Sequence, residues 1–359
     1  MAYTTIDDPS QYFQADTYTG GQTITFDGNS DLQPDWIWIK ARTTAENWRT
    51  FDTSRGVGSS TDATKGLVIS GAAAEEEYEI ITSMNSDGVS LNTSDAFLNS
   101  SSHTYSLSAW KFNGGSTSAI SSGGDIGIAT TSQVESTAKH SLQLYTGTGS
   151  QSSIGHGLSV APDWIIIKNR DQGDRWFTWF RGDGINTNQG LFLNATDTLA
   201  TTNGFMGNEN PTSVFIGLGT GHDTNASGEK YVCYTFSSVQ GYSKFGTYEG
   251  NGDADGPLVY TGFKPAWVLM KNADNANNWV LHDNARSPNP EPGNLVDEQL
   301  SPNSTNTEAT DSSKIDILSD GFKCRVADQG INNSGHTICY AAFAQNPFVT
   351  SKGVPVTAG

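Results

Sequence analysis

Two Asp–Arg pairs are the polar residues of this chain whose types and spacing most suggest a site. Asp52 and Arg55 lie three positions apart in FDTSRG, and Asp283 and Arg286 keep that spacing in HDNARS. A carboxylate and a guanidinium so placed can form a charge-assisted bridge that holds a turn. They could also form the polar rim of a carbohydrate or partner site. We favour the structural role, because a third, related segment has lost the pair.

Acidic, glycine and histidine patterns point less clearly to chemistry. Glu75, Glu76 and Glu77 could supply a glycosidase carboxylate pair, but a solvated face or an interface edge is the simpler explanation, since the related segments have no such run. GLGTG at 217–221 has no helix pattern after it, which disfavours a phosphate cradle. NGDADG at 251–256 lacks the closing Glu of a calcium loop and predicts a turn. With no zinc-like histidine spacing either, we predict no catalysis, no cofactor and no metal.

The three cysteines do not form a disulfide framework. Besides Cys233, the chain has Cys324 and Cys339, which could meet, but reduced thiols buried in strands are the expected state for these two residues.

Charge and hydropathy exclude several classes of partner. The formal net charge is −18, from 38 acidic and 20 basic residues, and such a surface repels the phosphates of nucleic acid. No apolar run has the length of a membrane span, and the first residues carry no apolar signal-peptide core. We therefore expect synthesis and folding in a cytoplasm, without membrane insertion.

The elements that must position these residues are indicated by a segment that occurs three times. It reads PDWIWIKAR at 34–42, PDWIIIKNR at 162–170 and PAWVLMKNA at 265–273. The shared signature residues are Pro34, Trp36 and Lys40, then Pro162, Trp164 and Lys168, then Pro265, Trp267 and Lys271, with Trp48, Trp176 and Trp279 fourteen positions after each proline. A register kept three times predicts three related units. At the places of the Asp–Arg pair, the middle unit has Phe180 and Asp183.

Alternation in the first copy predicts a strand with two bulky faces. One face would carry Trp36, Trp38, Lys40 and Arg42, and the other Ile37, Ile39 and Ala41. Such a strand suits the middle of a sandwich whose outer face is also partly covered. We interpret the tryptophans as core residues, with an exposed stacking platform for sugars as the alternative.

Abundant Gly, Ser, Thr and Asn, together with the absence of long helical periodicity, predict an all-β fold. We expect three tandem β-sandwich, jelly-roll-like repeats of about 100 residues. The predicted parts are an N-terminal arm at 1–13, repeats at 14–115, 141–240 and 241–348, a Ser/Gly-rich linker at 116–140 and a C-terminal arm at 349–359.

The succession of these motifs carries a family resemblance. YTGG at Tyr18, PDWIWIKAR, Trp48, FDTSRG, SDGVSL and NSSSHTYSLSAWKF together resemble a β-rich domain recurrent in structural proteins of tailed bacteriophages, especially marine ones. The opening MAYTTIDDPSQYF is also similar to the start of such proteins. The likeness covers nearly the whole chain and rests on packing residues. It is weakest in the third copy, where Ala273 replaces the arginine of the signature.

The resemblance implies a virion protein, made in the host cytoplasm and displayed on the particle exterior. We expect a tail-associated or fibre-like protein that contributes to host attachment through its loops, binding other capsid or tail proteins and a host-surface glycan or receptor. A homo-oligomer on the particle is expected. The alternatives are a capsid decoration protein with a purely structural role and a tail-associated polysaccharide-degrading enzyme.

Overall fold

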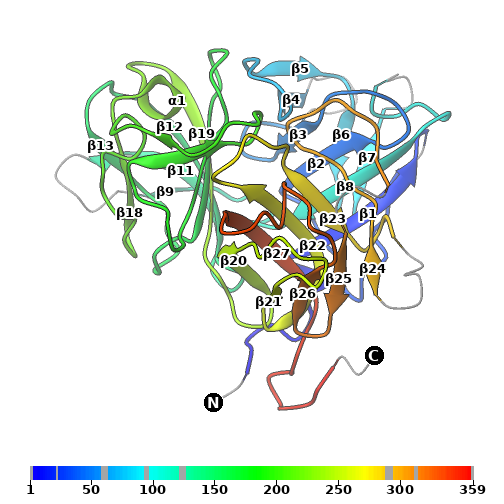
Figure 1. The fold of residues 1–359 in the computed structure, drawn as a ribbon. Coiled ribbons are helices and arrows are strands. Elements are labelled where there is room, and N and C mark those ends of the chain that lie inside the picture. Colours follow the sequence, from blue (N-terminus) through cyan, green and yellow to red (C-terminus); the bar gives the residue numbers. More distant parts are fainter. Residues whose placement is uncertain are drawn as a thin grey trace.

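The computed structural model describes residues 3–21, 23–57, 64–92, 97–120, 127–287, 294–310 and 314–356. Within these residues the fold is nearly all-β, as predicted from composition, with pairing that is antiparallel except between β10 and β13. The two helical pieces there are the 3₁₀ turn η1 (Pro9–Gln11) and the one-turn helix α1 (His222–Asn225). Figure 1 shows the sheets gathered around a common centre, with both chain ends at one end of the molecule.

Three main sheets form the body of the protein. The first contains, in spatial order, β1 (Phe13–Thr19), β8 (Thr104–Trp110), β2 (Trp36–Ala41), β3 (Arg49–Asp52), β4 (Thr64–Val68) and β5 (Glu76–Tyr78). The second contains β17 (Ala200–Thr201), β16 (Gln189–Phe192), β15 (Phe177–Phe180), β14 (Trp164–Asn169), β19 (Lys230–Phe236), β12 (His140–Thr146), β11 (Thr130–Glu135) and β9 (Ser118–Ile120). The third contains β20 (Ser243–Glu249), β27 (Thr337–Pro347), β22 (Phe263–Asn272) and β23 (Val280–Asp283).

A smaller sheet accompanies each main sheet. These sheets are β6 (Ile81–Met84) with β7 (Val89–Leu91); β10 (Gly127–Ile128), β13 (Ser152–Gly155) and β18 (Phe215–Leu218); and β21 (Leu258–Tyr260), β26 (Gly321–Cys324), β25 (Ile315–Leu318) and β24 (Leu295–Val296). Each main sheet and the small sheet that accompanies it are formed by consecutive strands of the chain. We therefore name β1 to β8 unit 1, β9 to β19 unit 2 and β20 to β27 unit 3.

The three main sheets share one order of four strands. The order is β1-β8-β2-β3 in unit 1, β12-β19-β14-β15 in unit 2 and β20-β27-β22-β23 in unit 3. In each, the strand that carries the signature lies between the closing strand of the unit and the strand that follows the second tryptophan. That the units are tandem copies of one repeat, with the bounds given above, stays a prediction.

The predicted linker at 116–140 differs from the structure. Its described residues include β9 and β11, which pair with each other and extend the main sheet of unit 2, while β10 pairs with β13. Ser and Thr suit such a strand, because their hydroxyls can bond within the sheet, as Thr130 and Ser132 do at 2.8 Å. The segment therefore belongs to unit 2 and is not a spacer.

Each unit encloses a core of its own between its main and small sheets. In unit 1, Ile37 and Ile39 of β2 meet Ile81 and Val89 of the small sheet. Corresponding clusters fill units 2 and 3. This is sandwich packing, in which alternate residues of each strand face inward.

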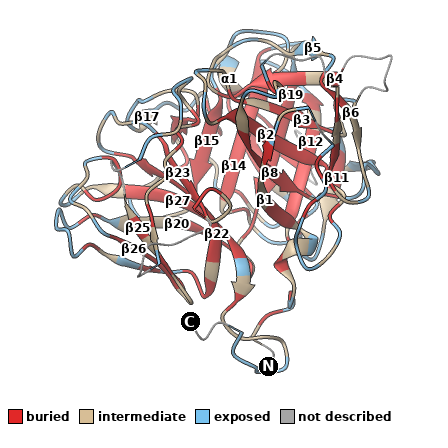
Figure 2. Ribbon diagram, turned by 90° about the vertical axis from the view of Figure 1, so that its right-hand side faces the viewer, coloured by how far each residue is buried: buried red, intermediate tan, exposed pale blue. Residues whose placement is uncertain are grey.

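A further core lies between the three units and is built from the opposite faces of their main sheets. It includes Trp36, Trp38 and Trp110 from unit 1, Trp164, Tyr234 and Phe236 from unit 2, and Trp267, Leu269 and Phe343 from unit 3. Figure 2 shows that the main-sheet strands are buried along most of their length. The two bulky faces predicted for the signature strand are thus both covered, one by its own sandwich and one by the other units.

Candidate functional site

The signature prolines and tryptophans are all buried. Pro34 and Pro162 lie just before β2 and β14, where a missing N–H is tolerated. Pro265 lies inside β22 at a shift of pairing register with β27, which is where a strand can accommodate proline. The first tryptophan of each copy is 0% exposed, so the alternative of a sugar-stacking platform is wrong for these residues.

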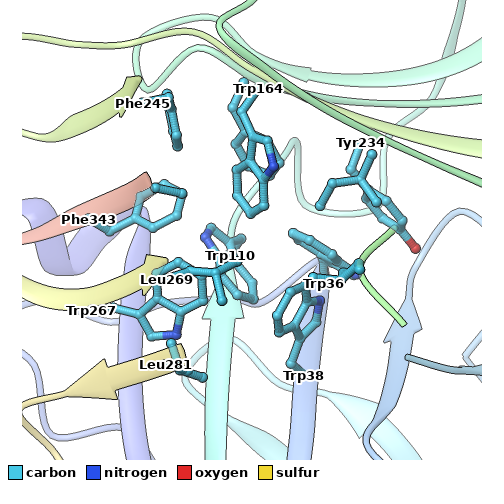
Figure 3. Packing of buried hydrophobic residues seen from close by; sticks show 14 of the residues in the cluster. Trp36, Trp38, Trp110, Trp164, Tyr234, Phe245, Trp267, Leu269, Leu281 and Phe343 are labelled. Carbon is cyan, nitrogen blue, oxygen red and sulfur yellow. The ribbon is translucent and has the colours of Figure 1, made fainter. Parts of the chain in front are cut away.

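The signature tryptophans meet in the shared core (Figure 3). Trp36 stacks on Tyr234 of unit 2 with ring centroids 4.1 Å apart, and its indole N–H donates to the Thr50 hydroxyl at 2.6 Å. Trp110 and Trp267 make an edge-to-face contact at 5.8 Å that joins units 1 and 3. Aromatic pairs of this geometry contribute about 0.5–1.5 kcal/mol beyond the area they bury. The signature therefore joins the units to one another.

The three signature lysines are buried and have one common role. Each ammonium donates to the carbonyl of the next residue and to a carbonyl four residues on: Lys40 to Ala41 and Thr44, Lys168 to Asn169 and Gln172, and Lys271 to Asn272 and Asn275. Burial lowers the pKa of each lysine to about 8. These residues close the turn after the signature strand.

The second tryptophan of each copy donates a hydrogen bond to another unit. The indole N–H of Trp48 donates to the carbonyl of Ser301 in unit 3 at 2.9 Å. Trp176 of unit 2 donates to Val68 of unit 1 at 2.8 Å, and Trp279 of unit 3 donates to Phe192 of unit 2 at 2.9 Å. Unit 1 binds unit 3, unit 3 binds unit 2 and unit 2 binds unit 1, so the bonds close a ring.

The Asp–Arg pair of unit 1 lies in one of these contacts. Arg55 pairs with Asp52, and both side chains are fully buried. Arg55 also contacts Glu75 at 3.2 Å, and Arg170, the last signature residue of unit 2, grips the same carboxylate at 2.8 and 2.9 Å. Burial alone would raise the pKa of Glu75, but the hydrogen bond from Arg170 and the two arginine charges lower it. Tyr234 completes the contact by donating to Asp52 at 2.6 Å.

Unit 3 repeats this arrangement with different residues of the chain. Arg286 pairs with Asp283 at 2.6 Å and with Glu308 at 3.0 Å. Arg42, the last signature residue of unit 1, grips Glu308 from the other side at 2.8 to 3.1 Å. The structural interpretation of both Asp–Arg pairs is correct, and the alternative of an exposed polar rim is wrong, because the side chains of all four residues are at most 1% exposed.

The remaining contact explains why the middle unit lacks the pair. It joins Ala273, which ends the third signature, to Leu199 of unit 2, whose amide donates to the Ala273 carbonyl at 2.9 Å. In the other two contacts, the corresponding backbone hydrogen bonds run from the amide of Glu75 to the carbonyl of Arg170 and from the amide of Glu308 to the carbonyl of Arg42. Because the third signature ends in Ala273 and not in an arginine, unit 2 needs no carboxylate at this contact. Ala273 joins the shared core and Leu199 packs against it, so this contact is apolar.

The sequence did not predict that four residues of these contacts act together, namely Glu308, Arg42, Arg170 and Tyr234. Glu308 is the counterpart of Glu75, although the acidic run was predicted to have none. Arg42 and Arg170 are visible only as the ends of the signature, and Tyr234 only as part of an aromatic strand. Glu308 and Arg42 are 266 positions apart, and no local pattern connects them.

The other candidate residues are placed in turns or edges. Glu76 accepts from Tyr78 and Glu77 pairs with Lys65, both at the exposed edge of unit 1. In NGDADG the side chains of Asn251 and Asp253 bind backbone amides two residues on. No group of three or more His, Cys, Asp or Glu among the described residues could hold a metal ion.

GLGTG differs from the expectation in one respect, because the one-turn helix α1 does follow it. Its glycines serve close packing, since a Cβ at Gly219 would lie 2.3 Å from the carbonyl oxygen of Asn203. All three cysteines are free and buried. Cys324 of β26 lies in the core of unit 3, whereas Cys339 of β27 lies in the shared core, so the main sheet of unit 3 separates them.

Exposed apolar side chains lie at the end of the molecule where the two chain ends are found. Asp7 accepts from the amide and the hydroxyl of Ser351, at 2.6 and 2.5 Å, so the two arms pair with each other. Tyr3 donates to the carbonyl of Gly262 at 2.8 Å, which attaches the N-terminal arm beside β21. Leu258, Tyr260, Val354 and Val356 project there with 55%, 56%, 57% and 40% of their surface exposed. We call these four residues the arm surface.

Comparisons with known proteins define the family but not its activity. A domain of unknown function, DUF7483, matches residues 8–347, so the chain belongs to that family. No curated protein and no solved structure matches the chain. No helix in the described ranges is long and apolar enough to cross a membrane.

Proposed function

We propose that this chain is a non-enzymatic structural protein of a tailed-bacteriophage particle, displayed on the exterior and contributing to host attachment. The residue pattern described above supports this proposal through its resemblance to virion proteins. The contacts of the buried acidic residues support it as well. Asp52, Glu75, Asp283 and Glu308 all bind buried arginines, and carboxylates so engaged serve assembly and not proton transfer.

The arm surface is the observation that carries the proposal. The three most exposed large apolar residues of the described chain, Leu258, Tyr260 and Val354, all belong to it. On a chain with a net charge of −18, large apolar side chains this exposed at one end of the molecule suit burial against another protein. Both arms leave the body at this end. A particle protein anchored here would present the opposite end of the molecule outward.

Binding to particles tests the anchor. We expect purified protein to sediment with particles that lack it, and Val354→Ser combined with Tyr260→Ser to weaken binding at least tenfold. Val214→Ser is the matched control, because Val214 is 49% exposed but lies in unit 2. Equal loss in the control, or full binding by the double variant, would contradict the proposal.

Attachment and pure decoration differ in a second measurement. An attachment protein binds host cells in a saturable manner, whereas a capsid decoration protein binds particles and not cells. Incubation with host surface polysaccharide addresses the enzymatic alternative, since a degrading enzyme releases new reducing ends and a binding protein does not.

A further inference from the structure

A polar groove of about 350 Å³ lies between β1 of unit 1 and the end of β27 in unit 3. Its polar wall consists of Gln14, Asp27, Asn29, Asn284, Gln345 and Asn346. Its floor is formed by Phe13 and three alanines, Ala15, Ala266 and Ala344. A second hollow of about 150 Å³ shares Asn284 and Gln345 with it and extends towards Lys264. Side-chain amides thus dominate a groove whose floor is made of small residues.

Beside the groove, unit 3 departs from the signature at one position. Units 1 and 2 have Asp35 and Asp163 after the signature proline, where unit 3 has Ala266. Asp35 accepts from the amides of residues 112–115 at 2.6 to 2.9 Å, and Asp163 accepts from the amide of Ser238 at 2.8 Å. These carboxylates hold the chain that follows the closing strand. Ala266 cannot do so, and residues 345–346 at the end of β27 line an open space instead.

The wall contributed by unit 1 is held rigid. The amide of Gln14 donates to the carbonyls of Ser10 and Ser30, at 3.0 Å each, and its oxygen accepts from the amide of Gly28 at 2.9 Å. A Cβ at Gly28 would lie 2.6 Å from the Gln14 amide atoms, so a side chain at position 28 would displace this amide. Asp8 fixes the same loop by accepting from the hydroxyl of Ser30 at 2.6 Å. A wall fixed before binding loses little conformational entropy on binding.

We propose that this groove is a binding site for a neutral saccharide of one or two sugar units on the host surface. Apart from Gln14, whose two N–H groups are used within the wall, the side-chain amides of the lining can both donate and accept, which matches the hydroxyl groups of a sugar. The volume lies within the range of small-molecule sites. The alanine floor leaves room for the faces of sugar rings, and no aromatic platform is needed. The identity of this ligand as a host glycan rests on the attachment role proposed above, whereas the site itself rests on the groove.

Charge and shape disfavour other ligands. Asp27 is an exposed carboxylate in the wall, and the chain has a net charge of −18, so acidic sugars and phosphates are repelled. A peptide ligand would use apolar pockets for alternate side chains. The lining residues are amides and alanines, with Phe13 only 2% exposed.

Restoring the aspartate of the other units tests the site. The probes are neutral mono- and disaccharides of glucose, galactose, mannose and N-acetylglucosamine, with sialylated and sulfated glycans on the same array. We expect binding to at least one neutral probe. Ala266→Asp should weaken this binding at least tenfold, because the new carboxylate fills the groove. Asn284→Ala and Asn346→Ala should each weaken it about two- to tenfold, as expected for one lost hydrogen bond.

Asn210→Ala is the matched control, since Asn210 is exposed on unit 2, away from the groove. Thermal unfolding verifies that each variant is folded. No neutral probe bound by the wild type, binding by anionic probes only, or an Ala266→Asp protein that binds as well as the wild type would each overturn the site. Ala266→Asp should still sediment with particles, so loss of saccharide binding with retained particle binding separates this site from the anchor.

Discussion

At the scale of single residues, the charged groups of the signature stabilise contacts between units. Arg55 and Arg286 lie fully buried, and each has an aspartate three positions before it and a glutamate from a distant loop. A buried arginine is tolerated only when its charge is paired. The pairing explains why these residue types occur together in two of the units.

Removing one carboxylate from a buried pair should be strongly destabilising. Asp52→Ala leaves the Arg55 guanidinium without its closest partner and the Tyr234 hydroxyl without an acceptor. We expect a loss of about 3–5 kcal/mol in the free energy of unfolding, measured by urea denaturation. Glu77→Ala is the control, because Glu77 and Lys65 form an exposed pair, and it should change the free energy by less than about 0.5 kcal/mol. Similar losses in both variants would contradict the assigned role of Asp52.

His140 should make the protein sensitive to acid. It is buried against Tyr242, whose hydroxyl lies 3.1 Å from its Nε2, and burial lowers the pKa of His140 to about 3. The unfolded chain binds this proton near pH 6.5, whereas the folded chain does not. The stabilising contribution is therefore complete above about pH 6.5 and is lost as the pH falls towards 3, by about 1.4 kcal/mol per pH unit.

Urea unfolding between pH 4.5 and 6.5 measures this slope. His140→Gln should reduce the proton uptake on unfolding by about one. His156, whose pKa burial lowers to about 4, provides a second such proton, so the double variant should lose about two. An unchanged slope would show that His140 is protonated in the folded protein.

At the scale of elements, the ring of tryptophan hydrogen bonds connects the three main sheets in addition to the shared core. Trp176 of unit 2 donates to the Val68 carbonyl of unit 1, whereas the indole N–H of Trp38 in the shared core has no hydrogen-bond partner among the described residues. The two residues are similarly buried, which allows packing and hydrogen bonding to be separated by experiment.

Replacing both tryptophans by phenylalanine separates these contributions. Each substitution removes similar packing, but only Trp176→Phe leaves a buried carbonyl unsatisfied. We expect Trp176→Phe to lower the free energy of unfolding by about 1–3 kcal/mol more than Trp38→Phe. Chemical denaturation monitored by circular dichroism measures both, and equal losses would mean that the bond between units contributes nothing.

At the scale of the whole molecule, the shared core makes the three units interdependent. Trp267, Leu269 and Phe343 face that core from unit 3, and a separated unit would expose them to water. The prediction of three sandwiches therefore does not mean three independent domains. Full-length protein should unfold in one transition, with equal calorimetric and van't Hoff enthalpies.

A fragment spanning 241–348 should be unfolded or aggregated when produced alone. Sparse proton chemical-shift dispersion would support this expectation. A folded, monomeric fragment, or three separate transitions in the full-length protein, would contradict it.

The sequence by itself determined the all-β class, the signature strands and the burial of their tryptophans, because alternation along a strand is a local property of neighbouring residues. Tertiary structure decided which units touch, that Glu308 acts as Glu75 does, that the described residues of the predicted linker extend a sheet, and that a groove lies beside Ala266. Those outcomes depend on groups brought together from distant positions of the chain, and the free energy of such contacts leaves no periodic trace in the order of the residues.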